Sequence, residues 1–209
     1  MVTINKELFS KMLVEASNRL IDNSTYFSEI DSRFGDGDHG VTIKKISLAI
    51  KSAVENWSDQ SLKDFIESLS VTIMGIGGGS AGPLWGTMIE GLALPLDENI
   101  MVIDSALLKK MLCSSLEEIQ SITTAKVGDK TMMDTLIPAV QAARETDGSI
   151  IQVLEAAATA AVSGAKETEK FVSKFGRAKS YKEQTIGTPD AGALSLSIFF
   201  IGLAAGAKQ

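Results

Sequence analysis

Apolar side chains recur at three- and four-residue steps along almost the whole chain, and this spacing limits the fold more than any other feature. The first stripe, over residues 6–22, consists of Leu8, Met12, Leu13, Ala16 and Leu20. Such a stripe occupies one face of an α-helix. Further stripes cover residues 43–57, 65–69, 107–119 and 132–143. The pattern predicts seven or eight helices in an all-α antiparallel bundle.

Capping residues support these helix assignments. Ser61 with Asp64, and Ser149 with Gln152, have the spacing of capping boxes. Asp190 is a suitable N-cap for the last helix, which runs through the uncharged residues 191–207. These 17 residues are at the lower limit for crossing a bilayer, so a buried helix is expected there.

Composition excludes several classes of partner. The 26 acidic residues outnumber the 20 basic ones, so the chain offers no broad basic face for nucleic acid or an anionic membrane. Cys113 is the single cysteine and lies in an apolar stripe, and no basic-then-apolar leader opens the sequence. We expect a cytoplasmic protein of one domain, residues 1–209, that holds any anionic ligand through a metal or helix N-termini.

Residues 31–40 place three carboxylates and three glycines in one short loop. Carboxylates so close together repel one another unless a cation neutralises them. Asp36 and Asp38 can turn toward one ion while Asp31 reaches it from the preceding turn. Mg²⁺ takes such oxygen ligands and keeps positions for phosphate oxygens. The loop therefore predicts a magnesium site, with a solvated acidic turn as the alternative.

A second glycine-rich stretch leaves a different fold open. Gly77, Gly79 and Gly82 match the G-x-G-x-x-G pattern, and residues 71–74 and 100–104 read as flanking strands. Together they would form a dinucleotide-binding α/β protein. Against it, no further strand-like runs alternate with helices, as a doubly wound sheet requires.

Loops at alternate junctions of an up-and-down bundle gather at one end. The loops at Asp31, residues 77–82, Gly128 and Gly187 would then share that end and suit a diphosphate. His39 is the only histidine. It is either a phosphoryl acceptor or a residue that contacts the nucleotide or fills space.

Phosphoryl transfer also requires cations around the phosphate oxygens. The cations in or beside these loops are Arg33, Lys126, Lys130, Arg177 and Lys179. Arginine is better suited than lysine because its planar fork binds two oxygens. We expect Arg33 to balance Asp31 and Arg177 to stabilise charge during transfer. A merely solvated Arg177 is the alternative.

Four motifs, in matching order over essentially the whole chain, resemble the L subunit of dihydroxyacetone kinase. They are Asp31 with residues 35–40, residues 78–87, residues 128–132 and residues 176–178. The resemblance implies an eight-helix antiparallel barrel with Mg-ADP across one end. In phosphotransferase-system members, a phosphocarrier (M-type) subunit recharges the bound ADP, and dihydroxyacetone is held on a K subunit. Other members are fused to K and use free ATP.

Matching the motifs assigns roles to individual residues. The metal ligands would be Asp31, Asp36 and Asp38. The nucleotide would be lined by His39, Gly40, Val41, Thr42, Ser80, Ala81, Met132, Arg177, Asp190, Ala191 and Gly192. The resemblance implies a kinase subunit that is active only with its partners. It leaves open the ketose, the phosphoryl donor and whether the chain forms a homodimer.

The chain departs from the family pattern on the loops near the expected phosphates. Ser80 and Ala81 stand where Ala-Ser is usual, and residues 123–125 where Gly-Lys-Ala is usual. Lys179 interrupts Gly-Arg-Ala-Ser-Tyr, and residues 188–192 replace His-x-Asp-Pro-Gly. The metal motif is retained, so the departures concern the phosphoryl acceptor and the partner. A paralogue serving another short ketose is one interpretation. A related domain opens fatty acid kinases, which tend to have Thr at the place of His39.

Overall fold

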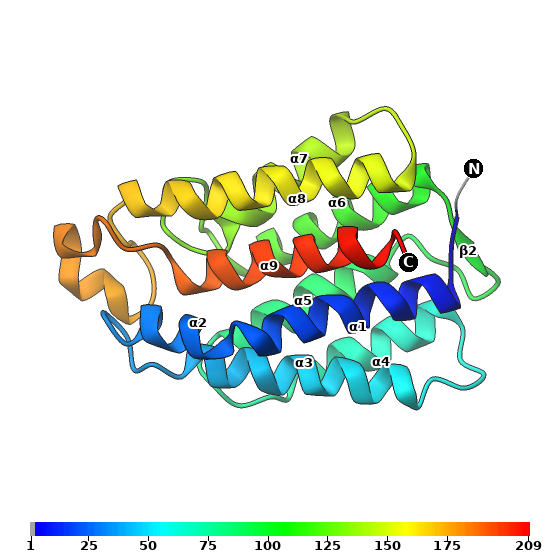
Figure 1. Ribbon diagram of the computed structural model, residues 1–209, viewed down its shortest axis with the longest axis horizontal. Helices are drawn as coiled ribbons and strands as arrows, with labels where there is room; N and C mark the ends of the chain where they lie inside the picture. Colours follow the sequence, from blue (N-terminus) through cyan, green and yellow to red (C-terminus); the bar gives the residue numbers. More distant parts are fainter. Residues whose placement is uncertain (1–2) are drawn as a thin grey trace.

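The computed structural model describes residues 3–209, and helices make up most of it (Figure 1). The α-helices of this part are α1 (Lys6–Asp22), α2 (Ser24–Asp31), α3 (His39–Glu55), α4 (Leu62–Met74), α5 (Ala81–Ala93), α6 (Ser105–Ile122), α7 (Met133–Glu145), α8 (Ile150–Glu167) and α9 (Ala191–Gly206). Two 3-10 segments, η1 (Thr168–Lys170) and η2 (Arg177–Thr185), separate α8 from α9. Strand β1 (Ile4–Asn5) pairs antiparallel with β2 (Val102–Ile103). The predicted all-α class is confirmed.

Helices α4, α8 and α9 begin at the capping residues that the sequence predicts. Ser149 and Gln152 form the predicted capping box at α8. The side chain of Ser61 accepts a hydrogen bond from the Asp64 amide at α4. Asp190 accepts one from the Ala193 amide, 2.8 Å away, at the start of α9. Side-chain oxygens thus satisfy amides that have no partner within the helix.

From α3 on, each helix packs against the next; in Figure 1 α3 and α9 run from left to right, and α8, the neighbour of α9, runs from right to left. Helix α9 packs against both α8 and α1, near the start of the chain. Most of α9 is buried, including Phe199 and Phe200, which confirms the predicted buried helix. In residues 3–209, every helix is too short or too polar to cross a membrane.

The structure differs from the sequence patterns at three places. Residues 71–74 belong to α4, so the Gly77-x-Gly79-x-x-Gly82 stretch joins two helices and the α/β alternative fails for the described residues. Helix α2 intervenes between α1 and the acidic loop; it buries only Phe27 and Ile30, too few to form a readable stripe. Residues 176–181, whose composition is typical of a loop, include the first part of η2.

Candidate functional site

A cavity of about 600 Å³ opens at the end of the bundle where α3, α5, α7 and α9 begin. The first residues of these four helices lie in its wall: His39, Ala81, Met133 and Ala191. A helix start presents backbone N–H groups without helical partners and the positive end of the helix dipole. Four such starts around one cavity create a strong preference for an anion such as phosphate.

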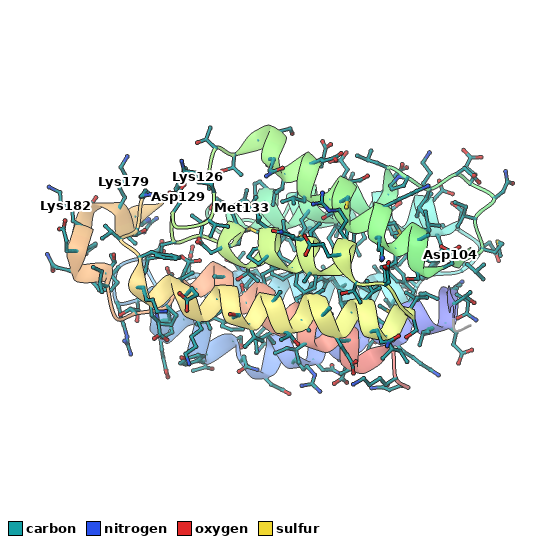
Figure 2. All side chains as sticks on the ribbon, turned by 90° about the horizontal axis from the view of Figure 1, so that it is seen from above. Asp104, Lys126, Asp129, Met133, Lys179 and Lys182 are labelled. Atoms are coloured by element: carbon teal, nitrogen blue, oxygen red, sulfur yellow. The ribbon has the colours of Figure 1, made fainter. Side chains whose placement is uncertain are left out.

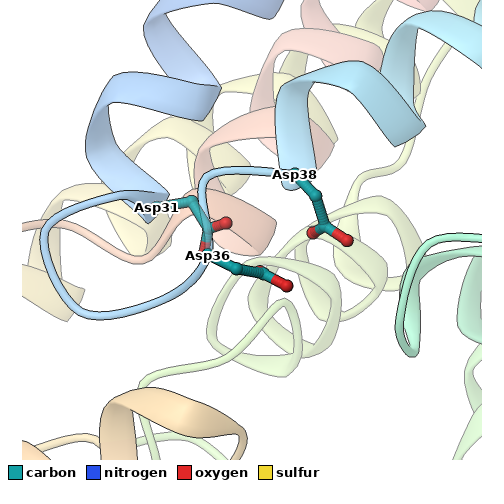
Figure 3. Close-up of side chains that lie close together, drawn as sticks. All are labelled: Asp31, Asp36 and Asp38. Carbon is teal, nitrogen blue, oxygen red and sulfur yellow. The ribbon is translucent and has the colours of Figure 1, made fainter.

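Asp31, Asp36 and Asp38 stand together on the cavity wall (Figure 3). One carboxylate oxygen from each lies within 4.8 Å of the other two. Asp31 ends α2 and Asp38 is the N-cap of α3. Between Asp36 and Asp38 the chain turns at Gly37, whose φ of 74° favours glycine.

The electrostatics of this cluster fit a divalent cation. Burial raises the pKa of Asp38, and the neighbouring charges of Asp36 and Asp31 raise it further. A hard dication would reverse that repulsion, and carboxylate oxygens are the ligands that Mg²⁺ takes. The three side chains therefore have the right chemistry and spacing to hold one ion.

Arg177 is the cation that meets the cluster. Its guanidinium forms an ion pair with the carboxylate of Asp36. The two side chains are 69% and 36% exposed, so the pair contributes only about 0–1 kcal/mol to stability. Arg177 can therefore turn to another anion at little cost. Arg33 does not balance Asp31 as predicted; its Nη1 lies 3.5 Å from the Thr188 hydroxyl, which belongs to a loop far along the sequence.

The ring of His39 is held by α9. Its Nε2 lies 2.9 Å from the hydroxyl of Ser195, and its edge meets the ring of Phe27. Burial lowers the pKa of His39 to about 4, so the imidazole is neutral near pH 7. This geometry is typical of a packed histidine that joins two helix starts.

Burial also favours the neutral form of Asp190, in the same cavity wall. Burial raises its pKa to about 7, although the hydrogen bond from the Ala193 amide favours the charged form. Its own amide donates to the Thr168 hydroxyl at 2.9 Å. Asp190 thus fixes the start of α9 beside the cavity.

Most residues predicted to line a nucleotide lie in the cavity wall: His39, Ser80, Ala81, Met132, Arg177, Asp190, Ala191 and Gly192. Gly40, Val41 and Thr42 do not. Gly40 and Thr42 are buried, and Val41 is 53% exposed on α3. Thr42 instead packs against Gly78, where φ is 141° and a Cβ would collide with the threonine side chain. Thr42 therefore supports a lining loop from behind.

The positions that depart from the family pattern also gather here. Those in the cavity wall are Ser80, Ala81, Thr123, Thr188 and Ala191. Lys179 lies outside the wall, in η2. The departures thus alter the surface that a ligand would meet and leave the three carboxylates unchanged.

Sequence reasoning missed several contributors. Phe34, Trp85 and Phe175 add apolar wall to the cavity. Asp134, which is 1% exposed, accepts hydrogen bonds from the amides of Gly128 and Thr131 and so closes the loop before α7. The spacing of Thr131 and Asp134, that of a capping box, was a usable signal. The aromatic residues gave none, because each belongs to a different part of the chain.

Comparisons with known proteins show the family of this chain. Residues 33–205 match the family model described as the DAK2 domain. The chain belongs to the DAK2 domain family. It is 29% identical over 199 residues to the ADP-binding subunit of PEP-dependent dihydroxyacetone kinase 1 of Listeria innocua, covering 95% of this chain and 96% of that subunit. The corresponding Escherichia coli subunit is 28% identical over 190 residues, covering 89% of this chain and 90% of its own.

Longer relatives match over part of their length. The L-erythrulose kinase of Pectobacterium atrosepticum is 30% identical over 211 residues, covering 91% of this DAK2 chain and 33% of that kinase. The crystal structure of the dihydroxyacetone kinase of C. freundii superposes with a TM-score of 0.72 at 25% identity, covering 95% of this chain and 34% of that one. A structure of that kinase with AMP-PNP and Mg²⁺ shares the fold, with a TM-score of 0.72, 23% identity and coverages of 98% and 35%. The DAK2 chain thus spans about a third of these longer kinases.

Proposed function

We propose that this chain is the ADP/ATP-binding subunit of a phosphotransferase of the dihydroxyacetone kinase type. One observation carries the proposal: a cluster of three carboxylates and four helix starts converge on a single cavity. Carboxylates attract Mg²⁺ and helix starts attract phosphates, so the cavity is suited to a magnesium nucleotide. Two relatives that match this chain end to end are named ADP-binding subunits.

We also propose that the whole chain is one domain, an eight-helix antiparallel barrel with the nucleotide across one end. In this arrangement α1 and α2 together count as one helix of the barrel, and each of α3 to α9 counts as one more. Packing of each helix on the next, and of α9 on α1, is what closure of such a ring requires.

Within this site, the residues take separate roles. Asp31, Asp36 and Asp38 hold Mg²⁺, which when bound neutralises and orients the phosphate oxygens. The nucleotide lies against His39, Ser80, Ala81, Met132 and residues 190–192. Gly40, Val41 and Thr42 hold the start of α3 and the loop on it in place. Arg177, released from Asp36, stabilises the charge that redistributes during transfer.

The acceptor in this proposal is dihydroxyacetone or a related short ketose held on a K-type partner subunit. The only histidine, His39, is engaged by Ser195, which leaves no imidazole to hold a ketose carbonyl. The end-to-end relatives are named PEP-dependent, which supports recharging by an M-type phosphocarrier. The L-erythrulose kinase among the relatives supports a short ketose other than dihydroxyacetone as a second acceptor.

Reconstitution tests this function. The purified chain with ATP alone should phosphorylate no dihydroxyacetone, and addition of a K-type subunit should give activity. Exchange of the copurified nucleotide against labelled ADP separates the two donors, since slow exchange indicates a coenzyme recharged by a phosphocarrier and fast exchange indicates free ATP. Robust phosphorylation by the chain alone would refute the division of labour.

A further inference from the structure

Lys130 is a buried lysine whose charge is surrounded by backbone carbonyls. The residue is 4% exposed. Its Nζ lies 2.6 Å from the Thr168 and Thr188 oxygens, 2.8 Å from that of Thr185 and 3.1 Å from that of Phe171. Among the ion pairs of residues 3–209, none includes Lys130. An ammonium has three protons, so carbonyls alone fill its donor capacity.

This arrangement has a cost. Burial lowers the pKa of Lys130, because the charged form loses its water. Its backbone φ of 61° is also in the left-handed region, which is unfavourable for a residue with a Cβ. Asp134 holds that conformation through the amides on either side, those of Gly128 and Thr131. A lysine needed only for packing would have both unfavourable effects and no compensating interaction.

The four carbonyls belong to the two ends of one segment, residues 168–188, which we call the lobe. It contains η1 and η2 and projects beyond the helices at the left of Figure 1. Figure 2 shows Lys179 and Lys182 on it, toward the same end as Lys126 and Asp129 and opposite Asp104. The Gly187 amide donates a hydrogen bond to the Glu169 carbonyl at 2.7 Å. This bond joins the two ends of the lobe, which we call its neck. Lys130 ties this neck to the loop that precedes α7.

The lobe also positions site residues. It carries Arg177 to the cavity wall and to its ion pair with Asp36. Thr168 links the neck to α9, since its carbonyl accepts from Lys130 while its hydroxyl accepts from the Asp190 amide. Met132 follows Lys130 by two residues and lines the same cavity. One ammonium therefore connects three parts of the wall.

We propose that Lys130 is a positioning residue: its ammonium fixes the lobe so that Arg177 faces the cavity. The kinetic part of this proposal rests on the proposed function, whereas the structural part does not. Loss of the ammonium should free the neck and let the lobe open while the helices remain folded. Arg177 would then spend less time at the site, and its contribution to turnover would fall.

Limited proteolysis tests the structural part. Lys130→Gly removes the ammonium and also the strain at φ 61°, so it should fold; Lys130→Met is the second variant. Trypsin should cut after Lys179 and Lys182 about tenfold faster or more in both, because opening becomes easier when hydrogen bonds to a buried charge are lost. Lys170→Met is the control, since Lys170 is an exposed lysine of the same lobe, paired with Glu167. Circular dichroism confirms that each variant is folded. Cleavage at the parent rate in the Lys130 variants would overturn the proposal.

A double-mutant cycle tests the kinetic part in the reconstituted system. Lys130→Gly should lower turnover by up to about a hundredfold, the loss that displacing a catalytic group by about 1 Å can cause. In an Arg177→Ala background the same change should have almost no effect, because Lys130 acts through Arg177. Equal losses in both backgrounds would overturn the positioning role. A parent that shows no ketose phosphorylation with its partners would instead refute the proposed function, and the proteolysis result would still stand.

Discussion

Replacing Asp36 by asparagine should weaken the binding of Mg-ADP and leave the stability of the ligand-free chain almost unchanged. The Asp36 side chain is 36% exposed and its ion-pair partner Arg177 is 69% exposed, so losing the pair costs about 0–1 kcal/mol. Removing one of three mutually repelling carboxylates offsets part of that cost. A charge-assisted ligand contact is larger, about 1.5–3 kcal/mol. Affinity for Mg-ADP should therefore fall about tenfold or more, with 1.4 kcal/mol corresponding to about tenfold.

Two measurements on the same protein decide this. Without ligand, Asp36→Asn should melt within about 4 °C of the parent, the shift expected of about 1 kcal/mol in a chain of this size. Calorimetry should show the loss of Mg-ADP affinity, and Mg-ADP should raise the Tm less than in the parent. Asp147→Asn is the matched control, because that side chain is fully exposed beside Lys109. Equal Mg-ADP affinities for Asp36→Asn and the parent would refute the metal-ligand role.

Three further predictions follow from single residues. Arg177→Ala should lower turnover with saturating partners by up to about a thousandfold while ADP affinity changes much less, and Arg177→Lys should restore little of it; unchanged turnover would make Arg177 a bystander. The pKa of Asp190 is about 7 in the native state against an ordinary 3.8, so between these pH values the native state binds a proton that the unfolded state has lost. The free energy of unfolding therefore falls as pH rises from about 4 to 7, by up to about 1.4 kcal/mol per pH unit from this group. His39, with a native pKa of about 4 against 6.5, acts in the opposite direction. The metal-free Asp190→Asn variant, which keeps the N-cap, should therefore gain stability relative to the parent as pH rises from 4 to 7, and a denaturant profile parallel to the parent's would contradict this. The Ser17 hydroxyl is buried without a partner among the described residues, so Ser17→Ala should raise the unfolding free energy by about 1 kcal/mol, and a lower value by denaturant titration would count against it.

The sequence predicted the features that depend on neighbouring residues. Helix α1 occupies the predicted residues 6–22 because its apolar stripe, its Asn5 cap and its burial all favour the same conformation. The clustering of the three carboxylates was also predictable, since Asp31, Asp36 and Asp38 lie within eight residues of one another in the sequence. Helix α2 was not, because two buried residues make no periodic signal.

The parts of the site that depend on tertiary structure could not be predicted. The sequence named Lys130 only as one of the cations in or beside the loops, because its four acceptors lie 38 to 58 residues further along the chain. His39 meets Ser195 across 156 residues. Periodicity and capping describe each helix by itself, and such contacts appear only when the helices are packed.

The dependence of ADP binding on magnesium tests the central claim most directly. ADP is titrated into the metal-free chain by calorimetry, once with Mg²⁺ and once with a chelator. The three-carboxylate cluster beside four helix starts predicts binding with Mg²⁺ that weakens about tenfold or more when the metal is removed, because the carboxylates then repel the phosphates. The same ADP affinity with and without Mg²⁺, or no ADP binding in either titration, would contradict it.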